Sequence, residues 1–263
     1  MHIYMHLFGL SIPSYGLMIV IGAFLANVIG YFLVKKEKKD FDDFILVEAY
    51  CILGGFIGAK LLYFIVSFND IEWNRFFEKE YLDMIMRSGF VFYGGLIGGI
   101  AAALLCGKLH KIDIKWFFTH CIFLIPMIHG FGRVGCFMAG CCYGIPYDGP
   151  LAVVFPEDSM AIHGVKLFPV QIVEAVFLIL ISLIVLYVTV KIKSRFTVET
   201  YLILYSILRF FLEHYRYDEA RGKFLGISTS QWISIPLFLG SLISIIYRKN
   251  HVKQVEGGAD HAS

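Results

Sequence analysis

The sequence predicts an all-α integral membrane protein with about seven transmembrane helices, its N-terminus outside the cell and its C-terminus in the cytoplasm. Its composition is the first reason: 58% of the 263 residues are apolar and 17% are charged, against roughly 45–50% and about 25% in soluble domains. The second reason is that the apolar residues form long uninterrupted stretches. A soluble domain cannot bury several such stretches in one core, so the soluble globular class is excluded.

Seven stretches are apolar and long enough for a bilayer core of roughly 30 Å, which a helix of about 20 residues crosses. They fall at 10–34, 44–68, 90–106, 116–131, 168–190, 197–214 and 231–247. The third and fourth are short and rich in glycine. We expect one seven-helix membrane domain over residues 1–250, followed by a polar cytoplasmic tail at 251–263.

The positive charges of the connecting segments predict the orientation. Lysine and arginine follow every second stretch, for example Lys35 after the first, Lys108 after the third, Lys191 after the fifth and Arg248 after the seventh. The residues before the first stretch contain neither. Because cytoplasmic loops are enriched in lysine and arginine, these basic segments belong in the cytoplasm.

The opposite, outer face carries the long irregular segments. Residues 69–88 alternate apolar side chains such as Trp73 and Tyr81 with charged ones such as Glu78 at helical spacing. This pattern predicts an amphipathic helix that either lies in the headgroup layer or packs on the bundle as an ordinary surface helix. The longest outer loop, about 132–167, is expected to form a loop domain. Loops held by a rigid scaffold are common places for functional sites.

Two glycine-rich segments lie inside the second and third stretches. Gly54, Gly55 and Gly58 lie in one, and Gly94-Gly95 with Gly98-Gly99 in the other. Small residues four apart let two helix backbones approach closely. A phosphate-cradling loop is disfavoured, because such a loop follows a strand and opens a helix. Helix packing is therefore the preferred interpretation.

A charged cluster ends the sixth stretch. Arg209 and Glu213 are four residues apart and share a helix face, and we expect Arg216 on that face too. Ionisable residues within membrane spans are functional candidates, and two guanidiniums can hold a phosphate by paired hydrogen bonds. The alternative is an Arg209–Glu213 ion pair that only stabilises the bundle, with Arg216 reaching out to the headgroups. The residues themselves leave both interpretations open.

A second cluster lies between His129 and Gly144. Its many glycines predict a helix break where backbone amides converge, and Arg133 adds a positive charge that suits an anion. Lys60 and Glu174 are further charges within spans. Gln171 lies three residues before Glu174, so their side chains face the same way.

The six cysteines fall into two groups. Those at 51, 106 and 121 are isolated and are expected to be packing residues. Cys136, Cys141 and Cys142 cluster on the predicted outer side, where a disulfide or inert packing, a thiol role with His129 or His163 as base, and a zinc site all stay open. Zinc has the weakest support, because C-x₄-C-C lacks a second ligand pair. We assign no metal ligand and expect no cofactor.

Six segments together resemble the prolipoprotein diacylglyceryl transferases of bacterial inner membranes, over nearly the whole chain. They are Ser14-Tyr15-Gly16-Leu17-Met18, Phe92-Tyr93-Gly94-Gly95-Leu96-Ile97-Gly98, Gly132 to Gly144, Pro169 to Glu174, Leu208 to Arg216, and Ser230-Gln231. The family has seven spans with its N-terminus outside. It transfers diacylglycerol from phosphatidylglycerol to the lipobox cysteine of a prolipoprotein and releases glycerol phosphate.

The resemblance implies roles for individual residues. Catalytic roles fall to Arg133, Arg209, Tyr93 and Glu213. Substrate-binding positions are Tyr15, Gly94, Gly95, Gly132, Gly144, Gln171, Glu174 and Arg216. The implied partners are phosphatidylglycerol, prolipoprotein signal peptides and membrane lipids, and no nucleic acid. The implied location is the bacterial plasma (inner) membrane, with the active site toward the outer leaflet.

This chain departs from the family pattern at several polar positions. Tyr93 stands where the family has histidine, Cys136 and Ala139 stand for two asparagines, Cys141 stands for a glutamate, and Phe168 stands for a histidine. Two other functions therefore stay open. One is a related phospholipid-dependent membrane enzyme with another acceptor, and the other is a non-enzymatic lipid-binding or transport protein.

Overall fold

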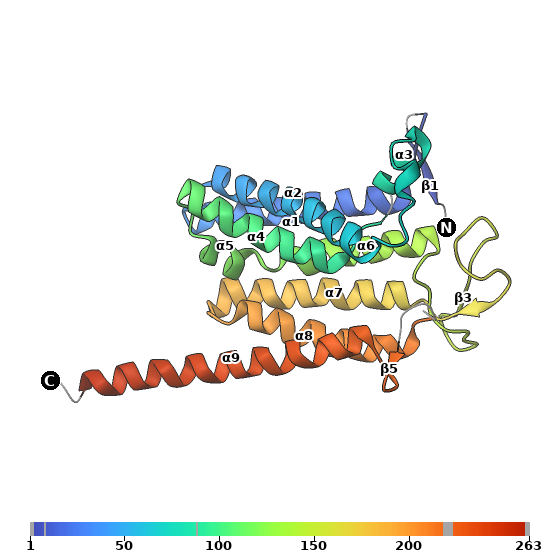
Figure 1. The fold of residues 1–263 in the computed structure, drawn as a ribbon. Helices are drawn as coiled ribbons and strands as arrows, with labels where there is room; N and C mark the ends of the chain where they lie inside the picture. Colours follow the sequence, from blue (N-terminus) through green and yellow to red (C-terminus); the bar gives the residue numbers. More distant parts are fainter. Residues whose placement is uncertain (1–2, 8, 88, 218–222, 261–263) are drawn as a thin grey trace. The chain divides into compact units, whose positions relative to one another are not determined.

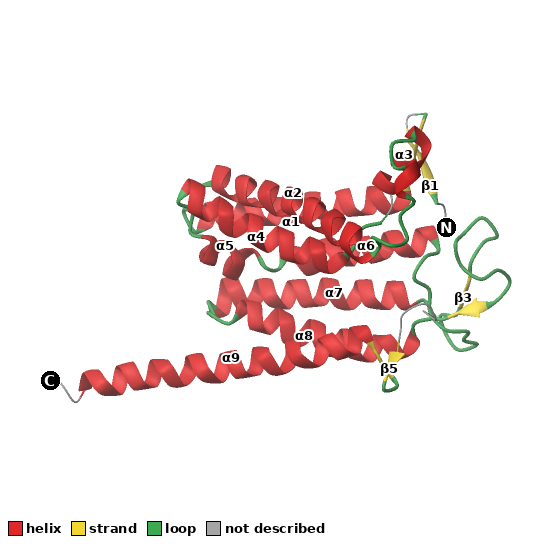
Figure 2. Ribbon diagram, in the orientation of Figure 1, coloured by secondary structure: helices red, strands yellow, loops and turns green. Residues whose placement is uncertain are grey.

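The computed structural model describes residues 3–7, 9–87, 89–217 and 223–260, and most of these are helical (Figures 1 and 2). Within these ranges, five helices are long and apolar enough to cross a membrane, and a bent pair can supply a sixth span. The prediction of a multi-pass all-α membrane protein is confirmed at this level. The helix at the sixth predicted stretch has 16 residues, so the count of seven stays a prediction.

The main helices follow the predicted stretches closely. They are α1 (Ser14–Lys36), α2 (Phe41–Val66), α4 (Phe92–His110), α5 (Ile114–Cys121), α6 (Leu124–Ala139), α7 (Val170–Tyr187), α8 (Thr197–Leu212) and α9 (Thr229–Asp260). Shorter turns and helices are η1 (Trp73–Arg75), α3 (Lys79–Arg87), η2 (Val188–Ile192) and η3 (Glu213–Tyr215). The short strands pair in antiparallel fashion as β1 (Tyr4–Leu7) with β2 (Leu10–Pro13), β3 (Val153–Val154) with β4 (Lys166–Leu167), and β5 (Lys223–Phe224) with β6 (Ile227–Ser228).

The chain divides into two compact units. The first comprises Met1–Gly30 and Phe118–Ser263, and the second comprises Tyr31–Phe117. A single domain over 1–250 stays a prediction. At the expected polar tail, α9 continues to Asp260, and residues 261–263 lie outside the described residues.

Close packing of α2 on α4 organises the second unit, and Figure 1 shows the two helices side by side. A Cβ on Gly98 would clash with the carbonyl oxygen of Gly54. A Cβ on Gly58 would clash with the carbonyl oxygen of Gly94. Side chains larger than hydrogen do not fit between these backbones. The packing interpretation of Gly54, Gly58, Gly94 and Gly98, which we call the glycine seam, is confirmed.

The predicted amphipathic segment 69–88 is not one helix but the turn η1 followed by the nine-residue α3. Tyr81 and Ile85 are buried together with Ile71, against Tyr63 and Phe64 of α2. This packing supports the surface-helix interpretation. A position in the headgroup layer stays a prediction.

Lys60, a predicted buried charge, links α2 to the end of α3. Its ammonium donates a hydrogen bond to the carbonyl of Ile85 at 2.6 Å and lies over the ring of Phe90, 4.3 Å from the centroid. Backbone carbonyls and an aromatic face both stabilise a cation. Lys60 therefore has structural partners within its own unit.

In the first unit, α6, α7, α8 and α9 pack in chain order. The predicted span 116–131 is two helices, α5 and α6, bent by 49°. The predicted helix break lies within the segment from His129 to Gly144, but at Gly140, because α6 continues through the earlier glycines to Ala139. Gly130 and Gly135 stay helical as close-packing positions. A Cβ on Gly135, for example, would lie 2.8 Å from Cα of Tyr15 on α1.

Candidate active site

The end of α6 brings three cysteines together. Gly140 adopts φ +73°, the amide of Cys141 donates to the carbonyl of Cys136 at 3.1 Å, and the amide of Gly140 donates to Phe137 at 3.2 Å. These two bonds form the Schellman arrangement that reverses the chain after a helix. As a result, the Sγ atoms of Cys136, Cys141 and Cys142 lie within 4.8 Å of one another.

No disulfide joins the cysteines that the structure describes. Cys142 has φ +57°, in the left-handed region that cysteine rarely adopts. Hydrogen bonds with the thiols of Cys136 and Cys141 lower the pKa of the Cys142 thiol, and the charges of Arg216 and Arg133 lower that pKa further, against the effect of burial. The cysteine cluster therefore lies within the field of two arginines.

A small backbone ladder follows the cysteines. The amide of Ile145 donates to Tyr215 at 3.0 Å, the amide of Phe168 donates to Ile145 at 3.0 Å, and Gly144 forms a β-bridge with Arg216. A Cβ on Gly144 would lie 2.7 Å from the carbonyl oxygen of Tyr215, so glycine is required by the close approach. The ladder holds the cysteine turn and Arg216 at a fixed spacing.

The prediction that Arg216 continues the face of the sixth helix is wrong. The α-helix ends at Leu212, a 3₁₀ turn follows, and the backbone of Arg216 is extended with φ −93° and ψ 137°. The expectation that Arg216 reaches out to headgroups also fails, since its side chain is 1% exposed. Its place in the ladder turns the guanidinium inward instead.

Glu174 on α7 holds two arginines through one oxygen. Its Oε2 lies 3.0 Å from Nε of Arg133 and 3.4 Å from Nη1 of Arg216. The Glu174 side chain is 1% exposed and that of Arg133 is 14% exposed. Buried charges are tolerated only when they are paired. Glu174 therefore stabilises both guanidiniums at one place.

Arg209 forms the second ion pair. Its Nη2 lies 2.6 Å from Oε2 of Glu213, as the spacing of four residues predicts, and donates to Oγ of Ser230 at 2.9 Å. Its Nη1 is buried and has no hydrogen-bond partner among the described residues. A buried donor without an acceptor is costly, so Nη1 is a candidate contact for a ligand oxygen.

We call Arg133, Arg209, Arg216, Glu174 and Glu213 the arginine cluster. Arg209 lies within the electrostatic field of Glu174, Arg216 and Glu213. The Arg209–Glu213 pair therefore lies near the group formed by Glu174 and its arginines. Among the described residues, this cluster has three guanidiniums and two carboxylates. The arrangement is suited to binding an anion.

Other predicted residues of the first unit surround this cluster. Gln171 is fully buried, its amide nitrogen donates to the carbonyl of Cys141 at 2.9 Å, and its Oε1 has no hydrogen-bond partner in the described part of the chain. Tyr15 opens α1 where α1 passes Gly135, and Gly132 faces Ile19 of the same helix. His129, the candidate base, lies within the field of Arg133, Glu174, Arg209 and Arg216 and packs on Tyr205.

Three predicted residues belong to the second unit. Gly94 and Gly95 lie in the first turns of α4, where Gly94 is part of the glycine seam and Gly95 faces the carbonyl of Gly55. The ring of Tyr93 packs edge-on against Phe92, with centroids 5.6 Å apart, and the residue is 39% exposed.

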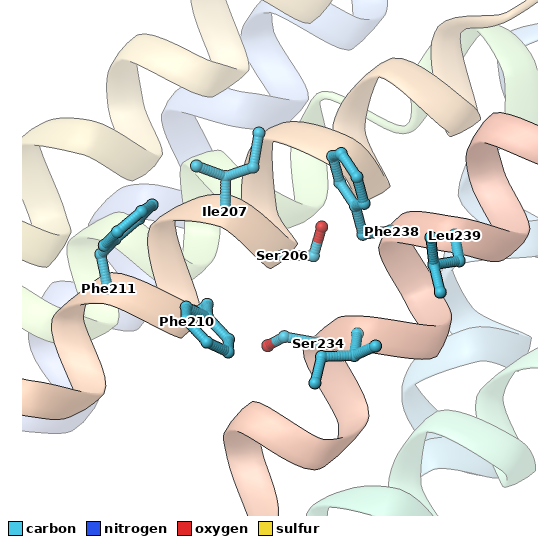
Figure 3. Close-up of a pocket in the computed structure, with 8 residues that line it drawn as sticks. Ser206, Ile207, Phe210, Phe211, Ser234, Phe238 and Leu239 are labelled. Atoms are coloured by element: carbon cyan, nitrogen blue, oxygen red, sulfur yellow. The ribbon is translucent and has the colours of Figure 1, made fainter. Parts of the chain in front are cut away.

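The sequence did not identify two features near Arg209. Ser230 is part of a recognised motif, but its contact with Arg209 depends on how α8 and α9 pack. The other feature is an apolar groove of about 230 Å³ between these helices (Figure 3). Its lining residues are Ser206, Ile207, Phe210, Phe211, Ser234, Ile235, Phe238 and Leu239. All faces of a membrane helix are apolar, so the sequence pattern does not mark one groove.

Comparisons with known proteins agree with the motifs. The family model described as prolipoprotein diacylglyceryl transferase matches residues 2–247. A phosphatidylglycerol–prolipoprotein diacylglyceryl transferase 2 of Clostridium perfringens is 36% identical over 253 residues, which cover 94% of each chain. A phosphatidylglycerol–prolipoprotein diacylglyceryl transferase of Clostridium tetani is 35% identical over 230 residues, covering 87% of this chain and 90% of the relative. The chain therefore belongs to the prolipoprotein diacylglyceryl transferase family.

Proposed function

We infer that this protein is a membrane transferase that moves the diacylglyceryl group of phosphatidylglycerol to the lipobox cysteine thiol of a prolipoprotein, in lipoprotein biosynthesis. Family membership and the names of the relatives support the reaction and both substrates. The observation that carries the assignment is the buried arginine cluster, in which Nη1 of Arg209 has no hydrogen-bond partner within the described part of the chain. The anion that it suits is the phosphate of the donor lipid.

The chemistry requires stabilisation of a leaving phosphate. The acceptor thiolate attacks the glycerol carbon, a C–S bond forms, the C–O bond breaks, and its electron pair stays on the oxygen of glycerol phosphate. In our proposal Arg133 and Arg209 bind this phosphate, because planar guanidiniums bind phosphate through paired hydrogen bonds. Donors aimed at charge that develops in the transition state accelerate the reaction.

The remaining site residues position these groups or contact substrate in the proposal. Glu174 and Glu213 fix the arginines, and Arg216 adds charge beside Glu174. The family resemblance alone supports a catalytic role for Tyr93. It alone also supports substrate contacts at Tyr15, Gly94, Gly95, Gly132, Gly144 and Gln171.

We assign one acyl chain of the donor to the groove between α8 and α9. Ser230, which accepts a hydrogen bond from Arg209, lies one helical turn from Ser234 in the groove lining. A phosphate held at Arg209 therefore lies within a lipid's reach of an apolar channel. Phe210 and Phe238, on opposite helices in Figure 3, supply its aromatic walls.

For topology we propose one domain with seven spans, the N-terminus outside and the tail 251–263 in the cytoplasm of a bacterial plasma membrane. The 16 residues of α8 rise about 24 Å, at ~1.5 Å per residue, and η3 extends them. The alternating basic loops support the orientation. The active site then faces the outer leaflet, with α3 near the headgroups.

Cysteine labelling tests this topology. In a background without native cysteines, Ser159→Cys should react with a membrane-impermeant maleimide in intact cells. Ser194→Cys, in the basic segment after η2, should stay protected until the cells are opened. Labelling of position 194 from outside would overturn the orientation and the leaflet assignment.

The reaction itself is tested by mass spectrometry of a lipobox peptide incubated with purified protein and phosphatidylglycerol. We expect the peptide to gain the mass of a diacylglyceryl group at its cysteine, and no gain when serine replaces that cysteine. Donor cleavage without peptide modification would instead favour another acceptor. Lipid binding without any cleavage would favour a non-enzymatic lipid-binding or transport protein.

A further inference from the structure

The three-cysteine cluster has the geometry of a metal site. All pairs of Sγ atoms at positions 136, 141 and 142 are within 4.8 Å. In tetrahedral zinc–thiolate sites, Zn–S bonds of about 2.3 Å place sulfurs about 3.8 Å apart. Small side-chain rotations therefore suffice to bring the three sulfurs around one ion.

The backbone around the sulfurs is fixed independently of any ion. The Schellman turn at Gly140 sets the spacing of Cys136 and Cys141, and Gln171 donates to the carbonyl of Cys141. Cys142 is held in a left-handed conformation that costs conformational energy. A site whose ligands are placed before binding loses less entropy when the ion binds.

The three sulfur donors are of the kind that zinc prefers. Arg133 and Arg216 both pair with the carboxylate of Glu174, and both guanidiniums act on Cys142. One Zn²⁺ with three thiolates carries a single negative charge. Soft thiolate ligands select zinc over Mg²⁺ and Ca²⁺.

We propose that Cys136, Cys141 and Cys142 bind one Zn²⁺ whose fourth coordination position takes the thiol of the acceptor cysteine. The proposal rests on the proposed function and adds the group that activates the acceptor. Three protein ligands with an open position are the pattern of catalytic zinc, whereas structural zinc has four.

In this proposal, zinc binding deprotonates the acceptor thiol. A thiol that binds zinc loses its proton, here to water, and becomes a thiolate. This sulfur attacks the glycerol carbon of the donor, the C–S bond forms, and the C–O bond breaks with its electron pair on the phosphate oxygen. The thioether product is a weaker ligand than a thiolate and leaves the ion, which keeps its three cysteines throughout.

Metal binding is the first test, with the full chain in detergent. After dialysis against Zn²⁺, we expect one zinc ion per chain in the wild type and in a matched control that changes Cys51, Cys106 and Cys121 to Ser. The C136S/C141S/C142S variant should bind none. With Co²⁺ in place of zinc, the thiolate-to-cobalt absorption should change when a lipobox peptide is added. A peptide with serine for cysteine should leave it unchanged.

Transfer as a function of pH is the second test, and it needs no mutation. A free thiol with a pKa of about 8.5 is about 3% thiolate at pH 7. Removal of zinc by a chelator should therefore slow transfer by about 30-fold at pH 7 and by less than about twofold at pH 9. Restored zinc should recover the rate.

The outcomes separate this proposal from the proposed function. Three results would each overturn the zinc site. The wild type could bind no zinc, the C136S/C141S/C142S variant could bind as much zinc as the wild type, or the cobalt spectrum could stay unchanged when the peptide thiol is added. Equal transfer with and without bound zinc would also overturn it while leaving the transferase assignment intact. Zinc binding and a peptide-sensitive spectrum without any diacylglyceryl transfer would instead refute the proposed function.

Discussion

The chain has two glycine-rich regions, and glycine serves a different purpose in each. In the glycine seam of the second unit, Gly54 and Gly58 of α2 face Gly94 and Gly98 of α4, and backbone lies against backbone. In the first unit, the segment from Gly130 to Gly144 packs α6 against α1 and α7, reverses the chain at Gly140 and passes through the ladder at Gly144.

The neighbours of the glycines distinguish the two regions. In the seam, a Cβ would meet backbone atoms of the other helix and the Cβ atoms of Ala102 and Leu62. The other segment includes Arg133 and the three clustered cysteines, and it lies against the buried Glu174. Close packing alone therefore does not identify a functional region. Buried charge beside close packing does, because burying charge is costly and persists only where something requires it.

The largest expected effect is on the arginines. Lysine keeps the charge but loses the planar pair of donors, so Arg133→Lys and Arg209→Lys separate charge from paired hydrogen bonding. Loss of one donor aimed at developing charge costs about 10²–10³ in rate, or roughly 2.7–4 kcal/mol. We expect each variant to lose this much transfer, measured with a lipobox peptide, while it still folds.

A matched control sharpens this result. Arg248 also pairs with a buried glutamate, Glu199, but lies outside the arginine cluster. Arg248→Lys should leave transfer unchanged. If Arg209 only stabilises the bundle through Glu213, Arg209→Lys keeps that pair and transfer barely changes. Near-normal transfer rates in both Arg133→Lys and Arg209→Lys would mean that these arginines only form structural ion pairs.

The next effect concerns stability in the seam. A methyl group on Gly98 has no room beside Gly54, whereas one on Gly55 would lie 3.5 Å from its nearest neighbour, an ordinary contact. Overpacking typically costs about 1–3 kcal/mol. Gly98→Ala should therefore lower the thermal unfolding temperature in detergent, and Gly55→Ala should not.

Activity per folded molecule completes the comparison. If the seam is purely structural, Gly98→Ala keeps the wild-type rate once the folded fraction is corrected for. A rate loss as large as that of the arginine variants, in a protein of normal stability, would mean that the seam takes part in the reaction.

The sequence predicts the helices better than their connections. Apolar runs locate α1, α2, α4 and α7 because lipid contact and helix burial both require apolar residues. The sequence pattern does not predict the bend between α5 and α6, nor the continuation of α6 to Ala139. Glycine alone does not distinguish a helix break from a close contact, and the outcome depends on Tyr15 and Ala175, which lie far away in sequence.

The same limit applies to the site. The spacing of four residues predicts the Arg209–Glu213 pair, which is present. The sharing of Glu174 by Arg133 and Arg216 was not predicted. It depends on where α8 ends and on a ladder between Gly144 and Arg216. Contacts between distant segments follow from tertiary packing, which a local pattern does not encode.

The smallest expected effect tests whether the orientation of Arg209 matters. Ser230 Oγ accepts a hydrogen bond from Nη2 of Arg209 at 2.9 Å, while Glu213 holds the same nitrogen at 2.6 Å. Ser230→Ala removes one of these two partners and keeps the charge. A hydrogen bond typically contributes about 0.5–1.5 kcal/mol, so we expect transfer to fall by about 2- to 10-fold. Ser230→Thr restores the hydroxyl and should restore the rate.

The effects of Ser230→Ala on KM and on kcat show at which stage of the reaction Ser230 acts. If Ser230 aims the guanidinium at a phosphate bound equally in ground state and transition state, KM for phosphatidylglycerol rises and kcat is unchanged. If the orientation of the guanidinium matters only in the transition state, as the phosphate leaves, kcat falls. Ser241→Ala is the control, since that buried hydroxyl on the same helix donates to its own backbone at Leu237. Equal losses in both serine variants would mean that α9 responds to any lost hydroxyl, and that Ser230 has no special relation to Arg209.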